Sequence, residues 1–157
     1  MNIKLIVIGK TDNCEMETLT QKYVSRLKHY VGFELITIPD IKNVKNLSEN
    51  QQKEKEGQEI LKRLGPSDAL VLLDEKGKEF DSVGFSDYLQ KKMNSGLKTL
   101  VFAIGGPYGF SKDVYAECQG KVSLSKMTFS HQMVRLFAVE QIYRGFTILR
   151  NEPYHHR

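Results

Sequence analysis

The sequence predicts an α/β fold in which a mostly parallel sheet is flanked by helices. Short apolar runs alternate along the chain with longer helical patterns, which is the arrangement of α/β proteins. The apolar runs are nearly continuous Val, Ile and Leu, as expected for strands buried on both faces. A chain of 157 residues that is 40% hydrophobic and 27% charged fits one domain, residues 1–157, with a single sizeable core.

The predicted elements follow one another without an internal repeat, a low-complexity tract or a linker. The apolar runs predict five strands, at residues 4–9, 33–38, 69–73, 99–104 and 121–124. Helical patterns predict five helices, at residues 14–31, 48–64, 82–95, 111–118 and 131–149. The segment 41–57 is polar enough to begin as a loop.

Neither a membrane segment nor a metal centre is expected. The apolar run in MNIKLIVIGK is too short for a signal-peptide core or a membrane span, which favours a cytoplasmic protein. Cys14 and Cys118 lack CxxC spacing and a nearby His partner, so the sequence supports neither a zinc site nor a disulfide framework. We expect both cysteines to be reduced and structural.

The positive charge is concentrated near the C-terminus. Residues 1–120 hold 17 Lys and Arg against 17 Asp and Glu, whereas residues 121–157 hold 6 basic and 2 acidic residues. A concentrated positive surface attracts polyanions such as nucleic acid through counterion release. On charge alone, a solvated basic face is an equally good interpretation.

Three loops that follow predicted strands are expected to converge. In open parallel sheets the ligand site forms beyond the carboxyl ends of the strands. DEKGK (74–78), GGPYGF (105–110) and SKMTF (125–129) each follow a strand, and Gly105 and Gly106 would let the backbone approach a ligand closely. Without other evidence, a Gly-Gly-Pro turn more often has only a structural role than a role in binding a ligand.

Common nucleotide and hydrolase motifs are absent from the sequence. GGPYG does not have GxGxxG spacing, it follows a late strand, and no acidic ribose partner lies about 20 residues downstream. The chain has neither the GxxxxGK[ST] phosphate loop nor the GxSxG elbow of serine hydrolases. The sequence therefore argues against a dinucleotide-binding protein, a P-loop nucleotide-binding protein and a serine hydrolase.

Several ordered motifs run along the chain from Leu73 onward. They are Leu73-Asp74 followed by Gly77-Lys78, the IGGPYG turn, LSKMTFSHQMVR, EQIYR (140–144) and a terminal PYH (153–155). Together they resemble the SPOUT-class methyltransferases, and most of all the RlmH group. The resemblance extends from KLIVIGK near the start to the final residues.

The resemblance implies both a fold and a function. The C-terminal part of the sheet would be threaded into a trefoil knot, which periodicity alone does not predict. The expected reaction is methylation of a pseudouridine ring nitrogen, N3, in helix 69 of large-subunit (23S) ribosomal RNA. The methyl donor would be S-adenosylmethionine, and the family favours the assembled ribosome as the substrate.

The resemblance also implies cofactor-binding positions in the knot loops. They fall on Leu73, Gly105, Leu124, Ser125, Lys126, Met127, Thr128 and Phe129. A sulfonium cofactor with an adenine needs apolar walls and a few amide contacts. It has no phosphate to be bound, which agrees with the lack of a phosphate-binding loop in the sequence. The chain has Phe129 and Ser130 where the family pattern has Leu and Pro, and Ser130 is suited to capping the following helix.

The predicted helix 131–149 is apolar over more than one stripe. Its apolar residues are Met133, Leu136, Phe137, Val139, Ile142, Tyr143, Phe146, Ile148 and Leu149. One side can pack on the sheet while another contacts a second surface, which predicts a homodimer. The alternative is a helix buried centrally in its own domain.

Methyl transfer requires positioning of the nucleotide and removal of a ring proton. The candidates for these tasks are His131, Arg135, Arg144, Tyr154 and His155. Each also has a plainer interpretation: a helix cap for His131, phosphate contacts for the two arginines, and a frayed tail or a weak metal-binding pair for the end of the chain. Glu140 and Arg144 are spaced to form a helix-stabilising pair.

The alternative is a protein that is not an enzyme: a non-catalytic RNA-binding or ribosome-binding module that uses the basic C-terminal surface. The sequence has neither the aromatic-rich RNP pattern nor the GXXG loop of common RNA modules. Binding of S-adenosylmethionine separates the two hypotheses, because such a module has no need of this cofactor.

Overall fold

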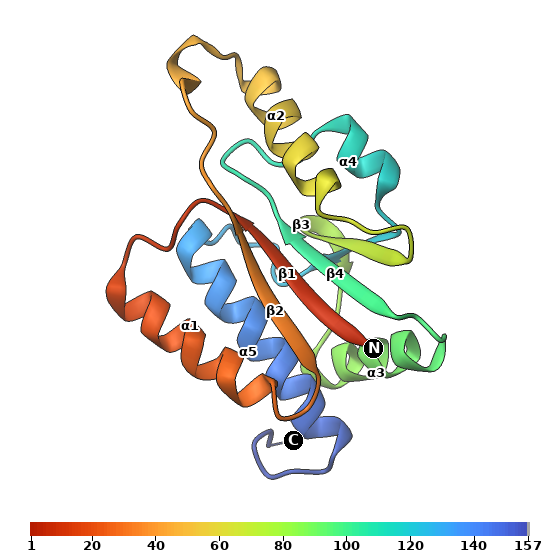
Figure 1. Ribbon diagram of the computed structural model, residues 1–157. Coiled ribbons are helices and arrows are strands. Elements are labelled where there is room, and N and C mark those ends of the chain that lie inside the picture. The colour runs from red at the N-terminus through yellow and green to blue at the C-terminus, as the bar shows by residue number, and fades with distance from the viewer. Residues whose placement is uncertain (157) are drawn as a thin grey trace.

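The computed structural model describes residues 1–156, which form a parallel sheet between two layers of helices (Figure 1). The strands lie in the order β2-β1-β4-β3-β5, and every neighbouring pair is parallel. Their bounds are β1 (Asn2–Ile8), β2 (Gly32–Ile38), β3 (Asp68–Glu79), β4 (Thr99–Ile104) and β5 (Gly120–Ser123). The helices are α1 (Cys14–Leu27), α2 (Glu49–Lys62), α3 (Ser82–Asn94), α4 (Lys112–Glu117) and α5 (His131–Leu149), with a short 3-10 turn at Val44–Asn46.

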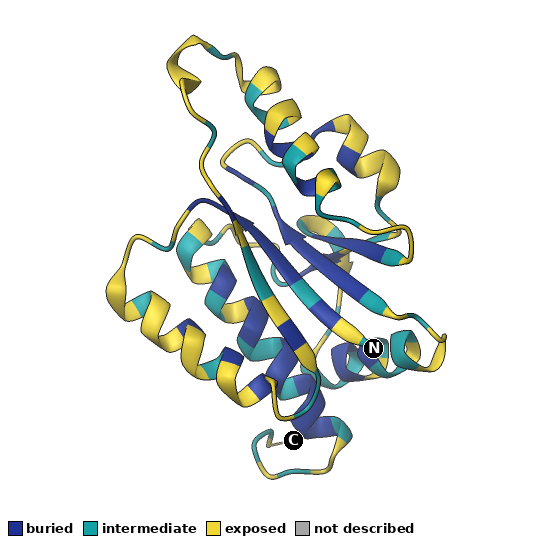
Figure 2. Cartoon of the chain, in the orientation of Figure 1, coloured by how far each residue is buried: buried dark blue, intermediate teal, exposed yellow. Residues whose placement is uncertain are grey.

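The inner strands of the sheet are buried on both faces, as their unbroken apolar runs predicted, whereas the edge strand β2 is partly exposed (Figure 2). On one face α1, α3 and α5 cover side chains such as Leu5 and Phe102, both 0% exposed. On the other face α2 and α4 cover Ile6 and Leu72, also 0% exposed. Alternate residues of one strand therefore enter two separate cores. The fold class is confirmed, whereas the trefoil knot stays a prediction.

The helices begin where the sequence supplies capping side chains. Asn13, Ser48, Asp81 and Ser111 each accept a hydrogen bond from a backbone N–H in the first turn of the helix that follows. Ser130 does the same for α5, accepting from the Met133 N–H at 3.2 Å. The predicted capping role of Ser130 is confirmed.

The strand β3 is longer than the predicted 69–73. It continues to Glu79, and its pairing with β5 shifts register between Leu73 and Lys78. The DEKGK segment is therefore an irregularity within the strand and not a loop after it. A Cβ on Gly77 would lie 2.6 Å from the Lys121 carbonyl carbon, so only glycine lets β5 approach this closely.

The two faces of α5 differ in burial. Ile142 is 2% exposed and packs in the core beneath the sheet, together with Val139 and Phe146. Met133 and Phe137 are 44% and 36% exposed. The sequence left open which residues of α5 face outward, and the structure assigns Phe137 to the outward face and Ile142 to the domain's own core.

Both cysteine thiols are free, with Cys14 exposed and Cys118 partly buried against the α2–α4 core. Among residues 1–156 no helix combines the length and the apolar composition needed to span a lipid bilayer. The same residues contain no group of three or more His, Cys, Asp and Glu side chains that could hold a metal ion.

Candidate functional site

A cavity of about 440 Å³ lies at the carboxyl edge of the sheet. It is formed by β3 near Leu73, by the glycine-rich turn after β4, by the loop between β5 and α5, and by the first turn of α5 at His131 and Val134. Parallel α/β sheets bind ligands at this edge. The three segments that the sequence analysis expected to converge do converge here.

The glycine-rich turn forms one wall of this cavity. The Gly109 N–H donates to the Gly106 carbonyl at 3.1 Å, and Gly109 has a φ of 85°, which a side chain would strain. A Cβ on Gly105 would lie 3.2 Å from both the carbonyl carbon and the oxygen of Gly109. The turn is therefore tight, and it presents backbone rather than side chains to the cavity.

The loop between β5 and α5 forms the opposite wall and is held by its own hydroxyl groups. Ser123 Oγ donates to the Ser125 carbonyl at 3.0 Å, and Ser125 Oγ accepts from the Met127 N–H at 2.9 Å. Thr128 Oγ1 donates to Glu75 Oε2 of β3 at 3.1 Å. The run of small hydroxyl side chains before α5 thus fixes the shape of a cavity wall.

Seven of the eight predicted cofactor-binding residues line the cavity. They are Leu73, Gly105, Leu124, Ser125, Met127, Thr128 and Phe129. Lys126 does not line it, and its Nζ lies 3.5 Å from Glu79 Oε1 in an exposed ion pair. Phe129, which departs from the family pattern, packs against Phe137 of α5 with ring centroids 5.1 Å apart.

The cavity also contains polar groups outside the predicted cofactor-binding set, from Asp74, Glu75 and Tyr115. The Tyr115 hydroxyl donates to Asp74 Oδ2 at 2.5 Å. Burial and this bond raise the pKa of Tyr115 to about 12, so the phenol stays protonated at neutral pH. One oxygen of Asp74 is thereby fixed, and together with Glu75 it gives this end of the cavity a negative character.

Two of the predicted catalytic residues lie beside the cavity in different environments. His131 is exposed at the start of α5 and lines the cavity. Arg135 is 2% exposed, and its Nη2 donates to the Ile8 carbonyl at 2.5 Å while its Nη1 lies 3.2 Å from Thr11 Oγ1. Arg135 therefore joins α5 to the end of β1, and its guanidinium does not face solvent where a phosphate would approach.

The other three predicted catalytic residues form a cluster with Glu140, which we call the tail cluster: Glu140, Arg144, Tyr154 and His155. Glu140 Oε1 accepts from Arg144 Nη2 at 2.7 Å and from the Tyr154 hydroxyl at 2.8 Å. Arg144 Nη1 lies 3.1 Å from His155 Nδ1, and its guanidinium lies 4.6 Å from the Tyr154 ring centroid. Burial, Tyr23 and Glu140 raise the pKa of Tyr154. Tyr154 and His155 are thus held against α5, so this part of the chain is not a frayed end.

The cavity lies at the start of α5, whereas the tail cluster lies along its second half, from Glu140 to the residues that follow the helix. The helix begins beside the carboxyl ends of the strands and runs back to the other end of the sheet, where the chain ends (Figure 1). His131 and Arg144 are 13 residues apart on one helix, a separation of roughly 20 Å along its axis. Within one chain, the five predicted catalytic residues are therefore not brought together.

Comparisons with known proteins give a consistent result over the whole chain. A family model described as "Predicted SPOUT methyltransferase" matches residues 1–155. The chain is 71% identical over 157 residues to "Ribosomal RNA large subunit methyltransferase H" of Flavobacterium johnsoniae, and 64% identical to the protein of the same name from Christiangramia forsetii, with 100% of each chain covered in both cases. A structural likeness to the SpoU methyltransferase AviRb of Streptomyces viridochromogenes has a TM-score of 0.46 and 11% identity, and it covers 96% of this chain and 61% of that one.

Proposed function

Because the chain belongs to the SPOUT methyltransferase family, we propose that it methylates the RNA of the large ribosomal subunit with S-adenosylmethionine as methyl donor. The observation that carries this proposal is the full-length similarity to proteins named for large-subunit ribosomal RNA methylation. The cavity formed by the loops that the family motifs occupy agrees with it. A basic excess in residues 121–157 suits an RNA substrate.

The specific target in this proposal is N3 of a pseudouridine in helix 69 of 23S ribosomal RNA, on the assembled ribosome. Its support is the resemblance of the five ordered motifs to the RlmH group. The name that the relatives carry supports the large-subunit ribosomal RNA as the substrate. The ring nitrogen of such a base carries a proton that must leave before or during methylation.

The residues around the cavity fit S-adenosylmethionine. Leu73, Ile104 and Leu124 provide apolar walls for an adenine, and the Gly105–Gly109 turn provides backbone amide groups. The carboxylates of Asp74 and Glu75 suit a ligand that bears positive charge on sulfur and on an ammonium group. When bound, the donor supplies an electrophilic methyl group, while the protein's task is to hold the ring nitrogen in line with it.

The exposed apolar surface of α5 supports the proposal of a homodimer. Met133 and Phe137 project from this helix, and Phe137 and Phe129 border a groove of about 400 Å³ that also includes Phe80. Contiguous apolar surface of this kind is typical of subunit interfaces. A two-fold dimer that pairs the α5 helices in opposite directions would bring each tail cluster next to the partner's cavity.

The active site in this proposal is composite, with the cavity of one subunit and the tail cluster of the other. The separation of roughly 20 Å along α5 supports this arrangement, because residues so far apart cannot act on one base within a single chain. Arg144 would contact a phosphate of the RNA, and Tyr154 and His155 would stack on or bond to the nucleotide. His131 would lie on the cavity side of the same site.

Replacing Gly105 with valine is expected to weaken S-adenosylmethionine binding by roughly tenfold to a hundredfold. A Cβ there already lies 3.2 Å from the Gly109 backbone, and overpacking of a fitted site costs about 1–3 kcal/mol. Isothermal calorimetry measures the effect.

The matched control is Gly120→Val, since a Cβ at Gly120 meets nothing within 4 Å. The absence of a binding heat with the unsubstituted protein would instead favour a non-catalytic RNA-binding module.

A further inference from the structure

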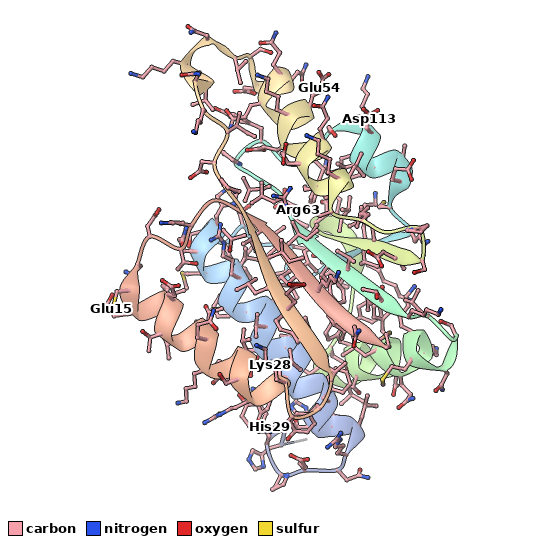
Figure 3. The ribbon with its side chains drawn as sticks, viewed as in Figure 1. Glu15, Lys28, His29, Glu54, Arg63 and Asp113 are labelled. Carbon is pink, nitrogen blue, oxygen red and sulfur yellow. The ribbon has the colours of Figure 1, made fainter. Side chains whose placement is uncertain are left out.

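Four tyrosine rings meet where the second half of α5 packs against the end of α1 (Figure 1). Tyr143 of α5 lies at the centre, and the ring centroids of Tyr23 and Tyr30 are each 5.8 Å from that of Tyr143. The ring of Tyr154, from the tail cluster, packs on Tyr143 with the centroids 4.8 Å apart. We call these four residues the tyrosine cluster. It joins the tail cluster to the end of α1, which Lys28 marks in Figure 3.

Two exposed arginines lie over rings of the tyrosine cluster. The guanidinium of Arg26, in the last turn of α1, lies 5.5 Å from the ring centroid of Tyr23 and 6.0 Å from that of Tyr143. The guanidinium of Arg150, directly after α5, lies 4.6 Å from the ring centroid of Tyr30. Contact with an aromatic face orients a guanidinium without using its N–H groups, so these donors remain available to a ligand.

Neither Arg26 nor Arg150 is paired with a carboxylate of residues 1–156. The arginine side chains that form ion pairs or hydrogen bonds in this part of the chain are those of Arg63, Arg135 and Arg144. Glu152 is near Arg150 in sequence, but its Oε2 accepts from the Tyr30 hydroxyl at 2.5 Å. This bond and burial raise the pKa of Tyr30 to about 12, so the phenol remains a donor to Glu152 at neutral pH.

Folding brings the two unpaired arginines to one surface from separate parts of the chain. Arg26 belongs to residues 1–120, in which basic and acidic residues are equal in number, whereas Arg150 belongs to the basic segment 121–157. Both lie over rings that contact Tyr143, and the Tyr154 ring contacts Tyr143 as well. The two cations therefore lie beside the tail cluster, which holds the target nucleotide in the proposed function.

A guanidinium with free N–H groups is suited to binding a phosphate through two parallel hydrogen bonds. In RNA the nucleotides on both sides of a target carry phosphates, and a basic surface interleaved with aromatic rings is typical of proteins that bind single strands. We propose that Arg26 and Arg150 bind phosphates of the ribosomal RNA next to the target nucleotide and so hold the strand across the tyrosine cluster. This inference rests on the proposed function.

The competing interpretation is that the two arginines are hydrated surface cations that only stabilise the tyrosine rings. Replacing both with glutamine removes the charges at a surface that takes no part in bond making. We expect the Arg26→Gln and Arg150→Gln double variant to raise the KM for unmethylated ribosomes roughly tenfold, because exposed charge pairs are individually weak. The kcat and the affinity for S-adenosylmethionine should stay unchanged, as expected when only binding is lost.

The matched control also removes two exposed positive charges, from the helices on the other face of the sheet (Figure 1). Lys55 of α2 and Lys112 of α4 are both exposed, and a Lys55→Gln and Lys112→Gln double variant should keep the wild-type KM. A second variant, Arg26→Lys with Arg150→Lys, keeps both charges but changes the contact with the rings. It should retain most of the affinity for ribosomes.

The salt dependence of binding provides a readout independent of activity. Binding of the S-adenosylhomocysteine complex to unmethylated ribosomes is measured by co-sedimentation over a series of KCl concentrations. Each phosphate contact releases counterions, so losing two contacts should make the plot of log affinity against log salt concentration less steep by about 1.5. The lysine variant and the control should keep the wild-type slope.

Three results would overturn the inference. An unchanged KM and slope in the glutamine variant would show that the two arginines bind nothing on the ribosome. Weaker binding with an unchanged slope would indicate a contact with a ribosomal protein instead of phosphate, and equal losses in the lysine and glutamine variants would indicate a purely structural role. If the unsubstituted protein does not methylate ribosomes, the proposed function itself fails, whatever the variants do.

Discussion

Replacing His155 with alanine is expected to slow ribosome methylation by roughly a hundredfold or more, because small errors in nucleotide placement cost about this much. His155 Nδ1 lies 3.1 Å from Arg144 Nη1, so the variant removes one member of the tail cluster and one of the contacts that position Arg144. Dimer formation and S-adenosylmethionine binding should be unchanged. The rate is measured by transfer of labelled methyl groups to ribosomes from a strain that lacks the modification.

The structure favours this point variant over removal of residues 153–157. Tyr154 packs against Tyr143 with ring centroids 4.8 Å apart and bonds to Glu140, so truncation would also remove packing. The matched control is His29→Ala, at an exposed histidine just beyond α1 (Figure 3). A wild-type rate for His155→Ala would contradict a role of this imidazole in methyl transfer.

Replacing Phe137 with aspartate is expected to dissociate the dimer and, with it, to abolish methylation. Phe137 is 36% exposed and borders the apolar groove next to Phe129. By two-fold symmetry the interface would receive two carboxylates, and each buried ion without a partner costs several kcal/mol. The dimer dissociation constant should therefore rise by more than about a hundredfold. Light scattering and sedimentation measure the change.

An aspartate at another exposed apolar position provides the comparison. Leu19 of α1 is 42% exposed, and Leu19→Asp should leave both the dimer and the methylation rate unchanged. A monomeric unsubstituted protein, or a Phe137→Asp variant that remains dimeric, would show that this surface is not the subunit interface.

The strands and the first cavity could be predicted because each depends on local sequence. Unbroken apolar runs identified the strands, and the rule that ligands bind beyond strand ends identified the glycine-rich turn and the hydroxyl-rich loop. The extension of β3 to Glu79 could not be predicted, because it depends on the close approach of β5 to Gly77. Local periodicity contains no information about such a contact.

The residues that sequence analysis missed are those placed by contacts between distant segments. Glu56 belongs to a polar stretch that is typical of a solvent-exposed helix, yet it is buried because α2 packs beside the glycine-rich turn. The only local signal of this burial in the sequence was the adjacent Gly57, which lets α2 pack closely on α4. A Cβ at Gly57 would be 3.0 Å from Val114 of α4. Likewise, the buried state of Arg135 depends on β1, more than 120 positions earlier.

The most direct test of a composite active site is to combine two variants that are impaired in different parts of the site, at a cofactor concentration too low for Gly105→Val to bind it. Gly105→Val impairs the cavity of its own subunit, and His155→Ala impairs its own tail cluster, so a mixed dimer would retain one site built from an intact cavity and an intact tail cluster. After the two variants are mixed and allowed to exchange subunits, methylation should return to about a quarter of the wild-type rate, because half of the dimers are mixed and each has one working site of two. Methyl incorporation into unmodified ribosomes is the measurement, with mixed dimers verified by mass spectrometry. Mixed dimers that remain inactive would contradict a site shared between subunits.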